Sequence, residues 1–175
     1  MVDLETVATD PQAAILTVAA IRFNTNHDYS QVTDPYTLDH FYCRVDLEQP
    51  GRSVSDDTMD WWSRQAPEIQ EEAFGEADRF MLADAMAAFT LWARAGDRYW
   101  ANGNAFDFPI LESAIKTHDL SNPWQFWQVR DARTIYNMVP DHHAPKAEAH
   151  HALYDCLNQI IRLNDCFNKM GRWPK

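Results

Sequence analysis

Apolar residues near the start of the chain follow the patterns of β-strands. Residues 15 to 24 (ILTVAAIRFN) and residues 39 to 45 (DHFYCRV) are apolar runs rich in β-branched and aromatic side chains. The polar segment NTNHD after the first run has the composition of a turn. A shorter candidate strand, MVDLE, precedes both runs. These segments predict the strands of a meander.

After residue 55 the spacing of apolar residues becomes helical. Pro67 separates a first helix from a second, and Gly75 marks a further break. The longest helical stretch covers residues 76 to 96. Gly96 ends it at the position where a C-cap glycine is expected.

The second half of the chain alternates short strands with helices. The pattern predicts a strand over 98–102, a helix from Asn104, a strand over 126–130, a short helix over 131–138, a loop over 140–149 and a final helix from Ala152 to Met170. Apolar residues recur in the final helix at spacings of three and four, which is typical of an amphipathic helix. Strands followed by helices interleaved with strands predict an α/β fold with a mixed central sheet.

Composition sets the size and the setting of this fold. A chain of 175 residues that is 46% hydrophobic suits one compact domain, residues 1–175, with its own core. No apolar run approaches the roughly 18 residues of a membrane helix, and the chain opens on a charged motif in place of a signal peptide. We therefore predict a cytoplasmic protein with no membrane partner.

The charge of the chain raises an objection to one class of partner. The formal net charge is −11, whereas proteins that bind nucleic acid usually carry a basic patch. Clustered carboxylates that hold metal ions escape this objection in part, because the ions neutralise them and attract phosphate. The charge thus predicts weak non-specific binding to long duplexes.

Four acidic residues are candidates for metal chemistry. Asp3 and Glu5 are two positions apart, so on a strand both side chains project from the same face. Asp107, in NAFDF, would lie in the first turn of a helix, and Asp155 borders the apolar stripe of the final helix. Carboxylates suit Mg²⁺ or Mn²⁺, and two such ions can stabilise the attacking and leaving oxygens of a phosphodiester. Taken alone, an acidic pair at the end of a strand is more often solvated surface.

Histidines are concentrated just before the final helix. An imidazole there could act as a general base, since it titrates near neutral pH. His150 is the candidate and His151 is its rival. A zinc site is the alternative, but the group lacks cysteine or glutamate partners at zinc-like spacing, and a solvated loop is the plainer interpretation. The group comprises His142, His143, His150 and His151.

The order of these residues resembles a known superfamily. The motifs D-x-E, N-x-F-D and H-x-A-L-x-D occur here as Asp3 and Glu5, as Asn104, Phe106 and Asp107, and as His150, Ala152, Leu153 and Asp155. This ordered set resembles the DEDD exonucleases, and the His-to-Asp spacing resembles their DEDDh branch, which includes ribonuclease T and oligoribonuclease. The segments WWSRQAPE and RDARTI are similar to the subgroup of phage exonuclease A and the mycobacterial-type exoribonucleases.

The resemblance implies a fold, a cofactor and an activity. The fold would be ribonuclease H-like and the cofactors two Mg²⁺ (or Mn²⁺) ions. Asp3 would bridge both ions, Glu5 and Asp155 would complete one site, and Asp107 would act on the other. His150 would be the general base, because H-x-A-L-x-D places its Ala and Leu correctly only from that residue. The expected activity is 3′→5′ exonucleolytic release of nucleoside 5′-monophosphates from single-stranded or overhanging 3′ ends.

Several finer points remain open in the sequence. RNA is the favoured substrate, while DNA, very short oligonucleotides and a catalytically silent nucleic-acid-binding module are alternatives. Arg133 could hold a phosphate or a structural carboxylate. For stacking on a base, Phe106 is favoured over either of the neighbouring tryptophans Trp61 and Trp62. The resemblance also allows a homodimer. The expected substrate-binding residues are Leu4, Thr6, Trp61, Phe106 and Arg133.

Overall fold

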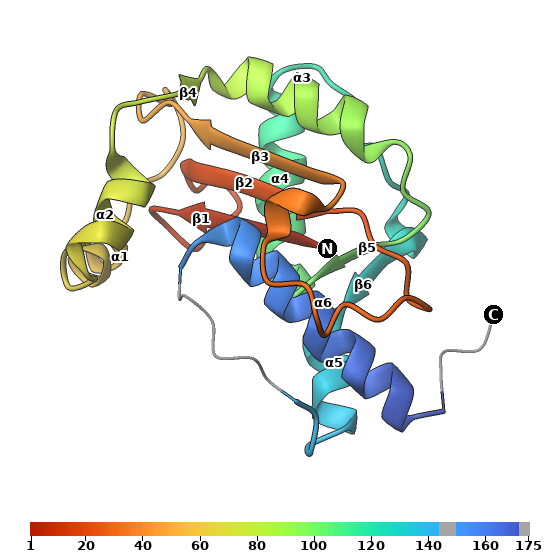
Figure 1. The fold of residues 1–175 in the computed structure, drawn as a ribbon. Helices are drawn as coiled ribbons and strands as arrows, with labels where there is room; N and C mark the ends of the chain where they lie inside the picture. The colour runs from red at the N-terminus through yellow and green to blue at the C-terminus, as the bar shows by residue number, and fades with distance from the viewer. Residues whose placement is uncertain (144–149, 172–175) are drawn as a thin grey trace.

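The computed structural model describes residues 1–143 and 150–171 and contains a six-stranded mixed sheet in the order β4-β3-β2-β1-β5-β6 (Figure 1). The β1–β2 and β2–β3 pairs are antiparallel, whereas the β3–β4, β1–β5 and β5–β6 pairs are parallel. The predicted α/β class is confirmed, and this single domain is compatible with a ribonuclease H-like fold. The strands are β1 Val2–Thr6, β2 Ile15–Ile21, β3 His40–Val45, β4 Arg79–Phe80, β5 Tyr99–Ala101 and β6 Val129–Asp131.

Helices cover both faces of the sheet (Figure 1). One buried cluster lies between the sheet and α3 and α4, and a second lies between the opposite face and α5 and α6. A smaller cluster joins the ends of β1 and β2 to α1 and α2. The helices are α1 Asp56–Ser63, α2 Pro67–Phe74, α3 Leu82–Ala93, α4 Asn104–Thr117, α5 Ala132–Met138 and α6 Ala152–Lys169, with 3-10 turns η1 Pro35–Thr37 and η2 Phe126–Gln128.

Strand β1 has a different role on each of its faces. Val2 and Leu4 are buried in the cluster beneath α3 and α4. Asp3 and Glu5 alternate with them and are only half-buried. Because successive side chains of a strand point to opposite faces, the two acids lie on the side covered by α6. The alternation seen in the sequence therefore sets which face of the sheet carries the charge.

The long helix predicted over residues 76–96 is wrong at both ends. Asp78 has a left-handed φ of 56°, which a right-handed helix does not allow, and Arg79 begins β4, paired in parallel with β3. The Arg79 guanidinium also donates to the carbonyls of Ala73 and Val45, which holds the segment against its neighbours. Helix α3 consequently begins at residue 82 and ends at Ala93, so Gly96 lies in the following turn and not at the C-cap.

Several predicted strands are shorter in the structure than in the sequence pattern, and two of them differ by three residues at one end. The strand expected over 15–24 ends at Ile21. The strand expected over 126–130 begins only at Val129, because residues 126–128 form η2. The side chain of Gln128 accepts from the backbone N–H of Gln125 and closes this turn. The helices predicted from Asn104 and Ala152 are confirmed, and most of the predicted loop over 140–149 lies outside the described residues.

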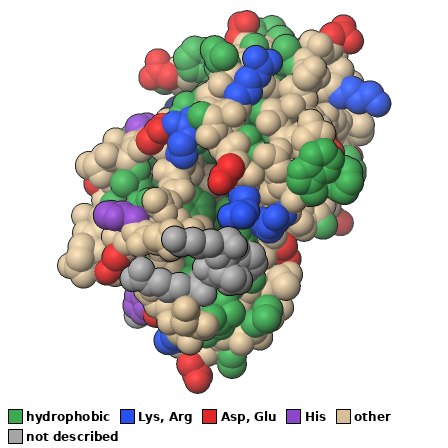
Figure 2. All heavy atoms as spheres, turned by 90° about the vertical axis from the view of Figure 1, so that its right-hand side faces the viewer, with side chains coloured by type: hydrophobic (Ala, Val, Ile, Leu, Met, Phe, Trp, Pro, Cys, Tyr) green, Lys and Arg blue, Asp and Glu red, His purple; other side chains and the backbone are tan. Residues whose placement is uncertain are grey.

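The hydropathy and charge of the sequence can be compared with the described helices and with one face of the surface (Figure 2). None of the described helices combines the length and the apolar character that crossing a bilayer requires. On the face shown in Figure 2, Lys and Arg side chains lie among acidic, hydrophobic and neutral ones. The net charge of −11 therefore does not produce a uniformly acidic cover on that face.

Candidate active site

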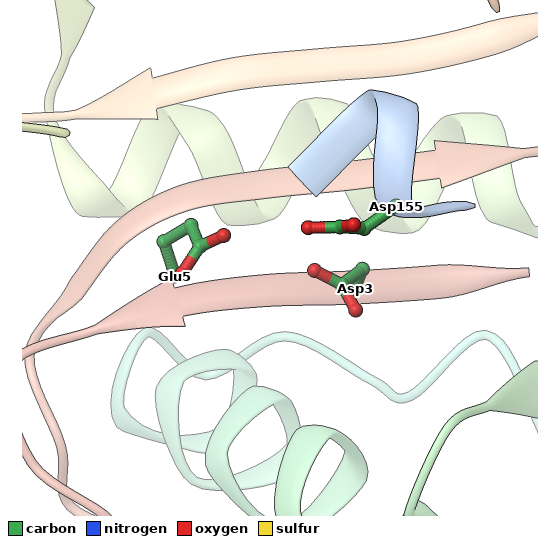
Figure 3. Close-up of side chains that lie close together, drawn as sticks. All are labelled: Asp3, Glu5 and Asp155. Carbon is green, nitrogen blue, oxygen red and sulfur yellow. The ribbon is translucent and has the colours of Figure 1, made fainter. Parts of the chain in front are cut away.

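Three carboxylates converge between β1 and α6. Asp3 and Glu5 extend from β1 toward Asp155, which lies in the first turn of α6 (Figure 3). One carboxylate oxygen from each residue lies within 4.8 Å of those of the other two. The sheet places two acids on one face by alternation, and the packing of α6 on that face brings the third to them.

Burial makes this carboxylate cluster hard to ionise. It raises the pKa of Asp3 well above its usual value, and the charges of Asp107, Glu5 and Asp155 raise it further. Burial is also the main cause that raises the pKa of Glu5 to about 8 and that of Asp155 to about 6. Within the described residues, no lysine or arginine forms a salt bridge with these groups. The cluster thus lacks a cation of its own, and its oxygen donors suit a hard divalent cation.

Asp107 lies next to the cluster without belonging to it. Its side chain is 4% exposed, and its Oδ1 accepts a hydrogen bond of 3.1 Å from the backbone N–H of Leu4, between the two acids of β1. Burial raises its pKa to about 7, although the bond from Leu4 and the nearby Arg133 act in the opposite direction. The fourth predicted acid is therefore held beside the other three by the backbone of β1.

The turn before α4 brings Arg133 close to Asp107. Gly103 adopts a left-handed φ of 107°, and a side chain there would meet the Arg133 guanidinium at 3.2 Å. That guanidinium donates to the carbonyl of Asn102 at 3.0 Å. Oδ1 of Asp131 accepts from the backbone N–H groups of Gly103 and Arg133, so one carboxylate ties the turn to the start of α5. Arg133 is exposed and lies on the Asp107 side of the site.

His150 and His151 have different surroundings. His150 has a left-handed φ of 68°, its backbone N–H is hydrogen-bonded to the Asp155 carboxylate, and its ring lies edge-on to Trp61 with 4.8 Å between centroids. Partial burial lowers its pKa. The ring of His151 instead stacks on Tyr42 at 5.2 Å, and its Nε2 lies 3.9 Å from a carboxylate oxygen of Glu72.

The zinc alternative finds no support among the described histidines. The Nδ1–H of His142 donates to the carbonyl oxygen of Val139, and its ring stacks on that of Tyr136. Within residues 1–143 and 150–171, the one group of three or more candidate ligands is the carboxylate cluster. The histidines therefore do not converge on a common point in this part of the chain.

A pocket of about 410 Å³ adjoins Glu5. It is formed where β1 meets α1 and the start of α4, so it opens beside the carboxylate cluster. Four of the five predicted substrate-binding residues line it, and Arg133 does not. The four are Leu4, Thr6, Trp61 and Phe106.

The adjacent tryptophans of α1 face in different directions. Trp62 is 2% exposed, packs in the small cluster under α1 and α2, and donates from Nε1 to the carbonyl of Thr6 at 2.9 Å. Trp61 is 36% exposed and stands at the pocket, against the ring of His150. Only Trp61 is placed where a ligand could contact a large part of its ring.

Gln159 is a residue at the site that the motif pattern did not indicate. Its Nε2 donates to Oδ1 of Asp3 at 2.7 Å. The available signal is its position four residues after Asp155, one helical turn further along the same face of α6. A buried polar residue one turn after a motif acid could have drawn attention to it.

Two comparisons with known proteins agree with this geometry. A family model described as the 3′-5′ exoribonuclease Rv2179c-like domain matches residues 1–167. The chain is also 26% identical, over 195 aligned residues, to a protein of Enterobacteria phage T4 named exodeoxyribonuclease. That alignment covers 93% of this chain and 86% of the phage protein.

Proposed function

Because the chain belongs to the family of the 3′-5′ exoribonuclease Rv2179c-like domain and is thus a 3′→5′ exonuclease, we propose that it removes nucleoside 5′-monophosphates from RNA 3′ ends. The reaction would use two divalent cations and His150 as the general base. The observation that carries this proposal is the convergence of Asp3, Glu5 and Asp155, without a cationic partner among the described residues, in a chain of this family.

The carboxylate cluster is the proposed place for Mg²⁺ or Mn²⁺. Asp3, Glu5 and Asp155 would hold one ion, and Asp3 with the adjoining Asp107 would hold the second. Divalent cations in this position supply positive charge for the scissile phosphate and lower the pKa of a water molecule. The raised pKa values of the carboxylates mean that a cation must displace protons when it binds near neutral pH.

His150 is proposed to take the proton from the attacking water. Burial lowers the pKa of its imidazole, so the neutral form that accepts a proton predominates at neutral pH. The hydrogen bond from its backbone N–H to Asp155 fixes the residue beside the cluster. His151 is engaged with Tyr42 and lies near Glu72, which supports His150 as the base.

The pocket beside Glu5 is proposed to receive the terminal nucleoside. Trp61 and Phe106 offer aromatic surface there, and stacking of a base on an aromatic ring contributes roughly 1 to 3 kcal/mol. Arg133, which is exposed near Asp107, is proposed to contact a backbone phosphate. A site of this kind holds only a few terminal nucleotides, which is compatible with a net charge of −11.

DNA is the second candidate substrate. The phage T4 relative is named an exodeoxyribonuclease, whereas the family description names an exoribonuclease. RNA is preferred here because the family model matches residues 1–167, while the identity to the phage protein is 26%. A homodimer and a cytoplasmic location remain predictions from the sequence.

A gel assay tests the proposal directly. RNA and DNA oligonucleotides of one sequence, 5′-labelled and carrying 3′ overhangs, are incubated with Mg²⁺, Mn²⁺ or EDTA and followed over time on denaturing gels. We expect RNA to shorten stepwise from its 3′ end only with metal, and the variant Asp3→Asn to leave it intact. Faster loss of DNA would favour the second candidate, and intact substrates in every lane would point to a silent binding module.

A further inference from the structure

Gln159 makes a direct contact with Asp3, the acid that would help to hold both ions in the proposed function. Its Nε2 lies 2.7 Å from Oδ1 of Asp3, the length of a charge-assisted hydrogen bond. Asp155 and Gln159 are one turn apart on α6, so one helix face supplies both a carboxylate to the cluster and a donor to Asp3. The donor therefore reaches Asp3 from the same element that closes the site.

The amide of Gln159 is buried at some energetic disadvantage. The residue is 8% exposed, and its Oε1 has no hydrogen-bond partner in the described part of the chain. A buried amide oxygen without a partner is unfavourable, and an apolar side chain would pack on this face without that penalty. The hydrogen bond from Nε2 to Asp3 is the favourable contact that offsets this cost.

The backbone of Gln159 is also held in place. The hydroxyl of Tyr136, on α5, donates to the carbonyl oxygen of Gln159 at 2.9 Å, and this bond is buried. The guanidinium of Arg162 in turn lies over the Tyr136 ring, with its Cζ 4.0 Å from the ring centroid. These contacts connect α5 to the turn of α6 that carries Gln159, so the amide is directed to Asp3 from a fixed backbone position.

We propose that Gln159 is a positioning residue that holds the Asp3 carboxylate in the orientation required to bind divalent cations. Asp3 lies close to Glu5 and Asp155, and without a donor its carboxylate would be turned by repulsion from these neighbours. A hydrogen bond to one oxygen fixes the plane of the group and favours its charged form. This inference rests on the proposed function, because it assumes that Asp3 is a metal ligand.

The test measures metal binding without nucleic acid. Mn²⁺ affinity is determined by calorimetry for the full chain and for Gln159→Met, which keeps the length of the side chain and removes the donor. Loss of a hydrogen-bond partner to a metal ligand weakens metal affinity by about 10- to 100-fold. We expect a reduction in this range, with an unchanged circular dichroism spectrum.

Asn164→Leu is the matched control. Asn164 lies on the same helix, is 5% exposed, and also has an unpartnered oxygen among the described residues, but its Nδ2 contacts the carbonyl of Thr25. Its replacement removes a buried amide without touching Asp3, so it should leave Mn²⁺ affinity unchanged. Equal affinity in wild type and Gln159→Met, or equal loss in both variants, would overturn the proposal.

A measurement on the wild type covers the case in which Gln159→Met does not fold. The side-chain amide resonances of Gln159 and Asn164 are followed by NMR during a Mg²⁺ titration. The Gln159 amide should shift with saturation while that of Asn164 stays constant, and a stationary Gln159 amide would contradict the inference. If the wild type binds neither ion, the metal-dependent function fails, and this outcome is distinct from failure of the Gln159 role alone.

Discussion

The carboxylate cluster and the aromatic wall beside it are built in different ways. The wall consists of the pocket residues Trp61 and Phe106 together with His150, whose ring lies against that of Trp61. The cluster comes from one strand and the helix packed on it, so strand alternation and a single packing contact define its geometry. The wall combines side chains from α1, α4 and the residues before α6. The geometry of the cluster therefore depends on one strand and the helix packed on it, whereas the geometry of the wall depends on how three separate segments pack.

The largest expected effect comes from the cluster. Asp3→Ala should lower kcat by more than about 10⁴-fold, because it removes the proposed ligand of both ions, each of which contributes several kcal/mol. The fold should remain intact, as Asp3 is a half-buried acid with a raised pKa in the metal-free protein. Single-turnover rates and thermal melting measure the two quantities, and near-normal turnover would remove the cluster from the mechanism.

The ring of His150 contacts Trp61 in the aromatic wall, but its proposed role is that of the general base. His150→Ala should reduce kcat on the order of 10²- to 10³-fold, the range typical of a general base. Mn²⁺ affinity should be unchanged, because the cluster keeps all its carboxylates. Rate and affinity measured on one preparation check both statements. His151→Phe is the control, and a larger loss of kcat in that variant would exchange the roles of the two histidines.

The adjacent tryptophans separate recognition from stability. Trp61→Ala should raise KM for RNA about 10-fold through the loss of one stacking contact, with little change in melting temperature. Trp62→Ala should instead lower the free energy of unfolding by about 3 to 5 kcal/mol, because it empties a buried site. Steady-state kinetics measure the change in KM, and denaturant titration measures the change in the free energy of unfolding. A Trp61→Ala variant less stable than Trp62→Ala would contradict these assignments.

The last expected effect concerns the stability of the metal-free protein. Folding raises the pKa of Glu5 from 4.5 to about 8 and that of Asp155 from 3.8 to about 6. Between about pH 4 and 8 the folded state therefore binds more protons than the unfolded state, so stability falls as pH rises. We expect the melting temperature in EDTA to decrease by on the order of ten degrees across this window. Mg²⁺ should reverse it at the upper end, and Glu5→Gln should flatten the profile.

Local patterns predicted the parts of the site that lie on regular elements. Strand alternation places Asp3 and Glu5 together, and the first turn of the helix from Asn104 contains Asp107 as expected. The final helix carries Asp155 at its start. Each of these features depends on neighbours in sequence or on an ordered motif, which is why the sequence alone could indicate them.

Other features depend on contacts between distant segments. The break before α3 arises from the pairing of β4 with β3, which no local pattern near Arg79 reports. The bond from the Leu4 N–H to Asp107 and that from Gln159 to Asp3 join residues more than 100 positions apart. The preference of His151 for Tyr42 likewise follows from the packing of β3 beside α6. Tertiary packing decides these details.

The separation of the cluster along the chain has a consequence for biosynthesis. Asp3 is synthesised before Asp155 and Gln159, which follow only after the residues of all six strands. A nascent polypeptide that has not reached α6 contains no assembled carboxylate cluster. The chain therefore acquires its complete carboxylate cluster only when α6 packs on the sheet.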